Sequence, residues 1–137
     1  CLIGGELALW TVARRSQAAA LHYTPALHYN SLQRASQTRN YPLEEFNDHL
    51  RGSAASRVSM EKTLSYFEPV HHARQIQVPT MLVEDSAGFC DVLVDAFSGP
   101  VDRVLFQHSS YRDGVQQANW IADKLGSGPP LLPAHWC

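Results

Sequence analysis

The sequence predicts an α/β fold built on a mostly parallel sheet, and three observations carry that prediction. Helical patterns alternate along the chain with short apolar runs, an order that favours parallel strands with helices on both faces. Hydrophobic residues make up 45% and charged residues 18% of the chain, a balance typical of a globular protein. With 137 residues, the chain has room for one hydrophobic core, so we expect one domain or part of one.

The apolar runs are the predicted strands. The first, residues 18–23, stops at the turn signal Thr24-Pro25. The second lies in the segment 76–84 and is predicted at Thr80 to Glu84. It follows Pro79, and a proline at the start of a strand removes no interior ladder bond. The third is residues 101–106. Because the intervening helices supply crossovers, we expect these strands to be adjacent and parallel.

Helical periodicity marks the segments between and around the strands. We expect a helix over residues 5–15, several short helices rather than one long one over residues 31–66, and a last helix over residues 113–125 that Gly126 ends. Within the middle segment, Tyr41-Pro42 opens a helix and Gly52 helps to close it. Residues 127–137 contain three prolines and are predicted to be an irregular tail.

Charge and cysteine usage exclude several classes of function. A formal net charge of -2 and the absence of a Lys/Arg run argue against a nucleic-acid partner. No run approaches the roughly 20 apolar residues of a membrane span, so we expect a soluble protein without a membrane partner and favour the cytoplasm. Cys1, Cys90 and Cys137 are odd in number and lack metal-ligand spacing. We therefore expect buried or terminal thiols, no metal and no cofactor.

Several landmarks between Pro25 and Pro79 carry a family resemblance. The passages Tyr41-Pro42-Leu43-Glu44-Glu45-Phe46 and Thr63-Leu64-Ser65-Tyr66-Phe67-Glu68, followed by Val78-Pro79, resemble segments of acetyl xylan esterases and cephalosporin C deacetylases in the same order. The resemblance covers residues 4–126, less than half of a full-length member. It implies a three-layer α/β-hydrolase sandwich, of which residues 1–126 form the C-terminal part. Helices at about residues 31–67 would be an insertion that projects over one end of the sheet.

In that family a serine on a tight turn before a helix attacks the ester carbonyl, a histidine takes its proton and an aspartate orients the histidine. Gly4-Gly5 resembles the end of the family's G-x-S-x-G-G pattern, which places Leu2 where the serine stands. We therefore expect the chain to begin too late for a complete active site, or to be a non-catalytic copy. Cys1 is a rival, since dienelactone hydrolases carry a cysteine in a similar turn.

The acid that the resemblance implies is Asp91, because Gly88-Phe89-Cys90-Asp91 is similar to the family's G-L-x-D passage. The alternative is that Asp91 caps the helix that follows it. Asp85 and Asp95 are weaker rivals.

The base that the resemblance implies is His108, which follows the last predicted strand. An ungapped alignment places Tyr111 there instead, but only a histidine titrates near neutrality as the role requires. The spacing from Asp91 to His108 is shorter than the family's. The other histidines are better explained as surface or strand-end residues: His22, His28, His49, His71, His72 and His135.

The resemblance implies an esterase that removes acetyl groups from acetylated sugars or xylan fragments by an acyl-serine mechanism. We expect the chain by itself to be inert, because no nucleophile stands in the pattern. The substrate would be a small-molecule or oligosaccharide ester, and family members often assemble as rings, which makes a homo-oligomer an expectation too. The alternative is a non-catalytic α/β-hydrolase relative that binds a ligand or a partner subunit.

Overall fold

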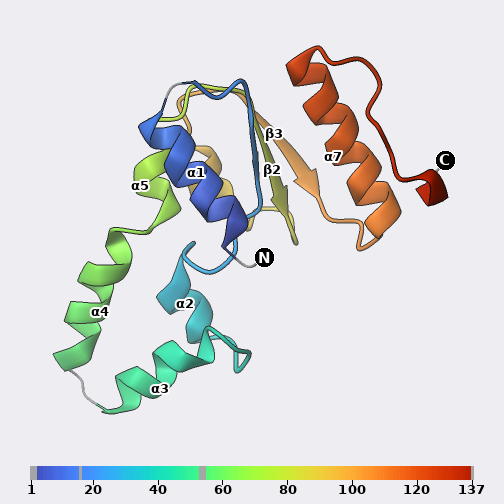
Figure 1. Ribbon diagram of the computed structural model, residues 1–137. Helices are drawn as coiled ribbons and strands as arrows, with labels where there is room; N and C mark the ends of the chain where they lie inside the picture. The colour runs from blue at the N-terminus through green and yellow to red at the C-terminus, as the bar shows by residue number, and fades with distance from the viewer. Residues whose placement is uncertain (1–2, 16, 53–54, 137) are drawn as a thin grey trace.

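The computed structural model describes residues 3–15, 17–52 and 55–136, so Cys1, Leu2 and Cys137 lie outside the described residues. The elements follow in the order α1 (Gly4–Arg14), β1 (Leu21–Tyr23), α2 (Ser31–Ala35), α3 (Glu44–Gly52), α4 (Ala55–Ser65), α5 (Pro69–Ala73), β2 (Thr80–Glu84), α6 (Asp91–Val94), β3 (Val101–Leu105), α7 (Ser110–Leu125) and the short 3-10 helix η1 (Ala134–Trp136). Figure 1 shows this course.

The three strands form one parallel sheet in the order β1-β2-β3, which confirms the α/β class and the parallel pairing. Pairing begins where Leu21 lies opposite Thr80 and Thr80 lies opposite Val101. The first strand is therefore shorter than predicted, whereas β2 has the predicted bounds. Residues 18–20 precede the point where β2 offers a partner, and Pro79 has no N–H with which to extend β2 toward residue 76.

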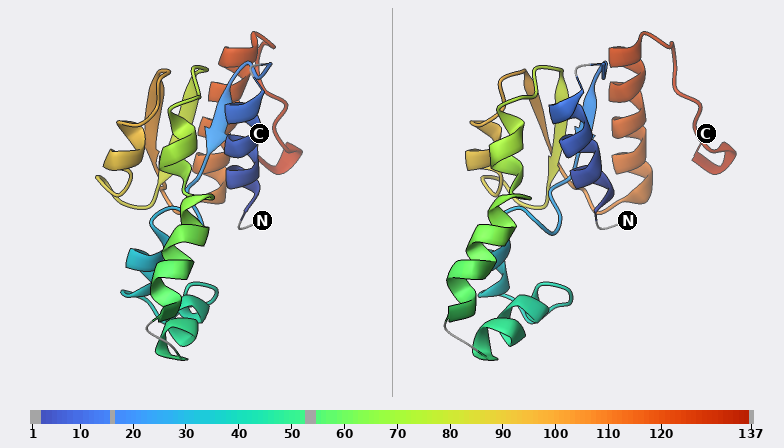
Figure 2. Two further views of the ribbon diagram at one scale, coloured as in Figure 1. Left: turned by 90° about the vertical axis from the view of Figure 1, so that its left-hand side faces the viewer. Right: turned by 60° about the vertical axis from the view of Figure 1, so that its left-hand side comes forward.

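Helices cover both faces of this sheet. Figure 1 shows α1 and α5 on one side of the strands and α7 on the other, and Figure 2 shows the same arrangement from two further directions. All five residues of β2 are buried, as expected of a central strand covered on both faces. The core on the α1 side joins Leu9, Tyr23, Ile76, Leu82 and Leu93. The structure thus shows a small α/β fold; a complete hydrolase sandwich would need more of a sheet than these strands.

Helices α2, α3 and α4 project beyond the carboxyl ends of the strands (Figure 1), as the resemblance implied. The short helix α5 was missed because five residues are too few to show helical periodicity. The helix that the capping alternative placed after Asp91 is α6, and it begins at Asp91 itself. The last helix begins at Ser110 rather than at residue 113, because the Ser109 hydroxyl caps it by accepting the Arg112 N–H. The tail predicted to be irregular contains η1.

Over the described ranges, no helix is both long enough and apolar enough to cross a membrane.

A close backbone approach at Gly99 generates a stability prediction. The Gly99 N–H donates to the Ile76 carbonyl at 2.9 Å, and a Cβ on Gly99 would lie 2.5 Å from the carbonyl carbon of Gln77. Gly99→Ala should therefore lower the free energy of unfolding by about 1–3 kcal/mol, because backbone must move to make room. Urea denaturation measures this, with Gly52→Ala as the matched control, since nothing lies within 4 Å of that position. Equal effects of the two substitutions would contradict the packing.

Candidate functional site

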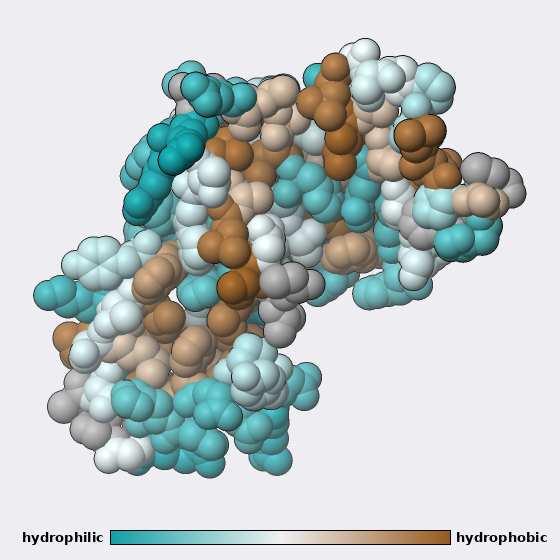
Figure 3. Space-filling view, in the orientation of Figure 1, coloured by the Kyte–Doolittle hydropathy of each residue, from teal (hydrophilic) through white to brown (hydrophobic). Residues whose placement is uncertain are grey.

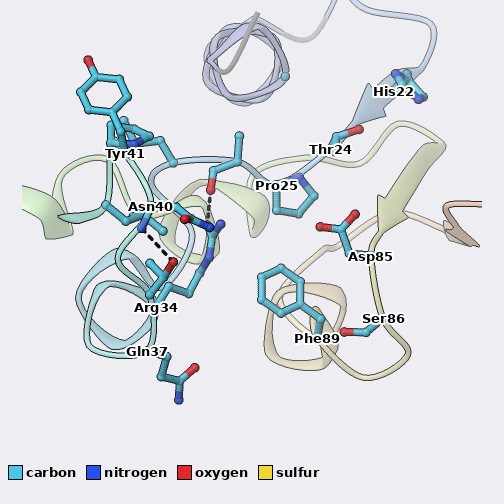
Figure 4. A pocket seen from close by; sticks show the side chains of 16 residues that line it. His22, Thr24, Pro25, Arg34, Gln37, Asn40, Tyr41, Asp85, Ser86 and Phe89 are labelled. Atoms are coloured by element: carbon cyan, nitrogen blue, oxygen red, sulfur yellow. Dashed lines mark hydrogen bonds between the residues drawn. The ribbon is translucent and has the colours of Figure 1, made fainter. Parts of the chain in front are cut away.

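A large cavity lies at the carboxyl ends of β1 and β2, where ligands of open α/β sheets bind. Its volume is about 880 Å³. Thr24, directly after β1, and Asp85, directly after β2, line it, and α2 with the segment that follows closes the other side. Figure 4 shows the Asp85 carboxylate pointing toward Pro25 and into this space. We call it the main cavity.

His108 lines a smaller depression of about 440 Å³, next to the main cavity. Asp85 lines both, so the two depressions are neighbours at the end of β2. Other lining residues come from the start of α7: Ser109, Ser110, Asp113, Gly114 and Gln117. The structure therefore brings Asp85 and His108, from the ends of neighbouring strands, to the lining of one depression.

The turn that presents His108 is held tightly. His108 has a φ of 54°, a left-handed conformation that is uncommon outside glycine and costs energy to maintain. The buried carboxylate of Asp113 accepts the N–H of Gln107 at 2.9 Å and the N–H of Ser109 at 3.1 Å, so it fixes the residues on both sides of His108. The His108 ring stacks on Phe106 with 6.3 Å between centroids. The imidazole is exposed, and a substrate can reach it.

Asp91 has a different partner. Its carboxylate lies 2.8 Å from Nη1 of Arg103 and its side chain is 61% exposed. The other edge of the same guanidinium binds the buried Glu84 carboxylate, with Nη2 2.7 Å and Nε 2.9 Å from Oε1. Asp91 is the first residue of α6 and makes no side-chain capping bond, so the capping alternative is not observed. Asp85 lines the same depression as His108. Asp91 does not line that depression and is paired with Arg103 instead.

The remaining sequence candidates are placed as follows. Asp95 is exposed at the end of α6, and Tyr111 is the second residue of α7 and half exposed. Cys90 is fully buried, and burial, with the nearby Glu84 charge, raises the pKa of its thiol to about 12, so it is no nucleophile near neutral pH.

The fold resembles that of a known hydrolase. No protein-family model matches the chain, and no curated protein matches it. Among solved structures, the chain is similar to an acetyl xylan esterase from Paenibacillus sp. R4, with a TM-score of 0.65 and 19% sequence identity. The likeness covers 84% of this chain but 41% of that enzyme, so the chain spans less than half of its length. At this identity the likeness shows the fold alone.

Two histidines have surroundings that the sequence did not reveal. His28 is not a surface residue: its Nδ1 lies 2.7 Å from the fully buried Glu6 carboxylate, which also accepts the His28 N–H at 2.6 Å. His22 lines the main cavity, and burial lowers its pKa. Its Nε2 is buried without a hydrogen-bond partner in the described part of the chain. The pairing of Glu6 with His28 could not be predicted, because a glutamate in the first turn of a helix does not indicate which residue it contacts.

Within the described ranges, no three His, Cys, Asp or Glu side chains are grouped as metal ligands would be.

The role of Asp113 in holding the His108 turn can be measured. Asp113→Ala leaves the N–H groups of Gln107 and Ser109 without their acceptor. We expect a loss of about 1.5–3 kcal/mol in the free energy of unfolding, the range for hydrogen bonds to a charged group. Asp123→Ala, on the exposed side of the same helix, is the matched control and should change it by less than about 0.5 kcal/mol. An unchanged free energy of unfolding in Asp113→Ala would mean that other contacts hold the turn.

Proposed function

We propose that this chain is the C-terminal part of a carboxylic ester hydrolase that removes acetyl groups from acetylated carbohydrates. One observation carries the proposal. A cavity of about 880 Å³ lies at the carboxyl edge of the sheet, and it neighbours the depression that holds an accessible histidine, in a fold similar to that of an acetyl xylan esterase. In this proposal His108 is the base.

The start of α1 lies where a nucleophile would need to be. Gly5 lines the main cavity, and a Cβ on it would lie 2.9 Å from the Thr24 carbonyl oxygen, so only glycine lets α1 approach this closely. In this proposal a serine preceding α1 is the nucleophile. Its hydroxyl would attack the ester carbonyl while His108 takes the proton and later gives it to the leaving sugar oxygen. This sequence has Leu2 at the pattern position, so we propose that the chain by itself is inert.

Two aspartates compete for the role of acid. The family pattern selects Asp91, and the placement favours Asp85. An acid that orients the imidazole must accept its N–H. Asp91 is engaged by Arg103 at 2.8 Å, whereas Asp85 lines the depression that contains His108. We therefore propose Asp85 as the acid and keep Asp91 as the alternative.

A second proposal is a non-catalytic relative that binds a ligand in the main cavity. The leucine at position 2 and the engagement of Asp91 by Arg103 favour it. The two proposals differ in whether a serine turn restores turnover.

A hydrolysis assay tests the first proposal. The chain should not hydrolyse p-nitrophenyl acetate faster than its His108→Ala variant, because a base and an acid without a nucleophile have no covalent route. Residues 4–136 fused behind the N-terminal part of an acetyl xylan esterase, serine turn included, should gain turnover. His108→Ala and Asp85→Asn should then each lower kcat by roughly 10³- to 10⁴-fold.

The control for these variants is Asp95→Asn, an exposed aspartate directly after α6. A fall with Asp91→Asn instead of Asp85→Asn would return the acid role to Asp91. Turnover of the fusion that is indifferent to His108 would refute the proposed base. Hydrolysis by the chain itself that survives His108→Ala and disappears in Cys1→Ser would identify a cysteine nucleophile.

A further inference from the structure

A separate depression lies between α1 and the junction of α4 with α5. Its volume is about 410 Å³, within the roughly 300–1,000 Å³ range of small-molecule sites. Its lining includes, on the side of α1, Leu7, Trp10, Arg14 and Arg15, and on the side of the junction Tyr66, Phe67 and His72. No described residue lines both this depression and the main cavity, so the two are different sites. We call it the Trp10 groove.

Aromatic rings make up much of the lining of the Trp10 groove. The Trp10 ring lies 5.7 Å from the Phe67 ring and 6.4 Å from the His72 ring, measured between centroids. The His72 Nε2 lies 2.9 Å from the Tyr66 carbonyl oxygen, which ties α5 to the junction that carries the rings. Tyr66, Phe67 and Leu7 nevertheless stay exposed. Large apolar side chains that gather around a hollow, rather than lying singly on a surface, mark a binding surface.

The charged groups that line the Trp10 groove have one sign. Arg14 and Arg15 are exposed there, and no Asp or Glu among the described residues lines it. Within the described ranges neither guanidinium has an ion-pair or hydrogen-bond partner, so their donors stay available to a ligand. A guanidinium can bind a carboxylate through two parallel N–H groups. Figure 3 shows hydrophobic side chains over the lower part of α1 and strongly hydrophilic ones near its upper end.

Rings and cations together narrow the class of ligand. A simple inorganic anion would leave the rings exposed, whereas a neutral aromatic molecule would leave both arginines unpaired and a cationic one would be repelled. We propose that the Trp10 groove binds a small aromatic acid, with its ring against Trp10 and Phe67 and its carboxylate on Arg14 and Arg15. Binding there does not depend on ester hydrolysis, because the main cavity shares no described lining residue with it.

Calorimetric titration of the full chain tests this site with 2-naphthoate, its neutral analogue 2-naphthalenemethanol and its saturated analogue decahydro-2-naphthoate. We expect 2-naphthoate to bind about tenfold or more tightly than either analogue, because it combines a flat ring with a carboxylate. The double variant Arg14→Gln, Arg15→Gln should lower the affinity for 2-naphthoate by about tenfold or more and bring it to that of 2-naphthalenemethanol. Both positions are exposed, so the variant should fold.

The matched control is Arg74→Gln, Arg112→Gln, which removes the same charge at two exposed positions outside the Trp10 groove. Arg74 directly follows α5 as Arg15 directly follows α1. The control should keep the full affinity for 2-naphthoate. Equal affinity for 2-naphthoate and either analogue would overturn the proposal, and so would a loss in the control as large as that in the Arg14, Arg15 variant. So would an absence of 2-naphthoate binding, or binding that the Arg14, Arg15 variant leaves unchanged, because the acid would then lie elsewhere.

Discussion

The carboxylate of Glu84 determines how the carboxyl edge of the sheet is built. It is 2% exposed at the end of β2 and accepts hydrogen bonds from Arg103 of β3 and, at 3.1 Å, from the N–H of Cys90 at the start of α6. A buried carboxylate without such partners would be costly, so the strand ends and the loop between them must stay together. Because successive strand residues point to opposite faces, Glu84 faces α6 and the next residue, Asp85, is directed away from Arg103 toward the main cavity.

This arrangement explains why the fold was more predictable than the site. The three strands, their parallel order and the projecting helices follow from apolar runs, turn signals and helical periodicity, which are local properties of the sequence. The partner of Asp91 is not local. Arg103 lies twelve positions further along, on β3, and nothing in the passage Gly88-Phe89-Cys90-Asp91 indicates that Asp91 is engaged by it. The sequence likewise contained no indication that Glu6 pairs with His28. Nor did it indicate that the Asp113 carboxylate accepts two hydrogen bonds, from the N–H groups of Gln107 and Ser109.

The carboxyl edge of the sheet faces a wall of a different kind across the main cavity. Asp85 follows the buried strand β2, and the Asp113 carboxylate together with the Ser109 cap holds the turn at His108. The wall that faces them comes from α2, α3 and the segment between, where most polar side chains are exposed. In the proposed function, positions that touch the reacting ester are held by the sheet, and positions that touch the rest of the substrate stand on the projecting helices. Sites on such a scaffold can change the ligand that they select without loss of the catalytic geometry.

The most direct test of this account is whether the imidazole nitrogen shifts of His108 depend on the carboxylate of Asp85 or on that of Asp91. Two-dimensional NMR of ¹⁵N-labelled chain at one fixed pH records the imidazole nitrogen shifts, and a His108→Gln variant assigns the signal among the seven histidines. The account predicts that Asp85→Asn moves the His108 nitrogen shifts and that Asp91→Asn, whose carboxylate is bound to Arg103, leaves them in place. Shifts that move with Asp91→Asn and stay with Asp85→Asn would contradict it.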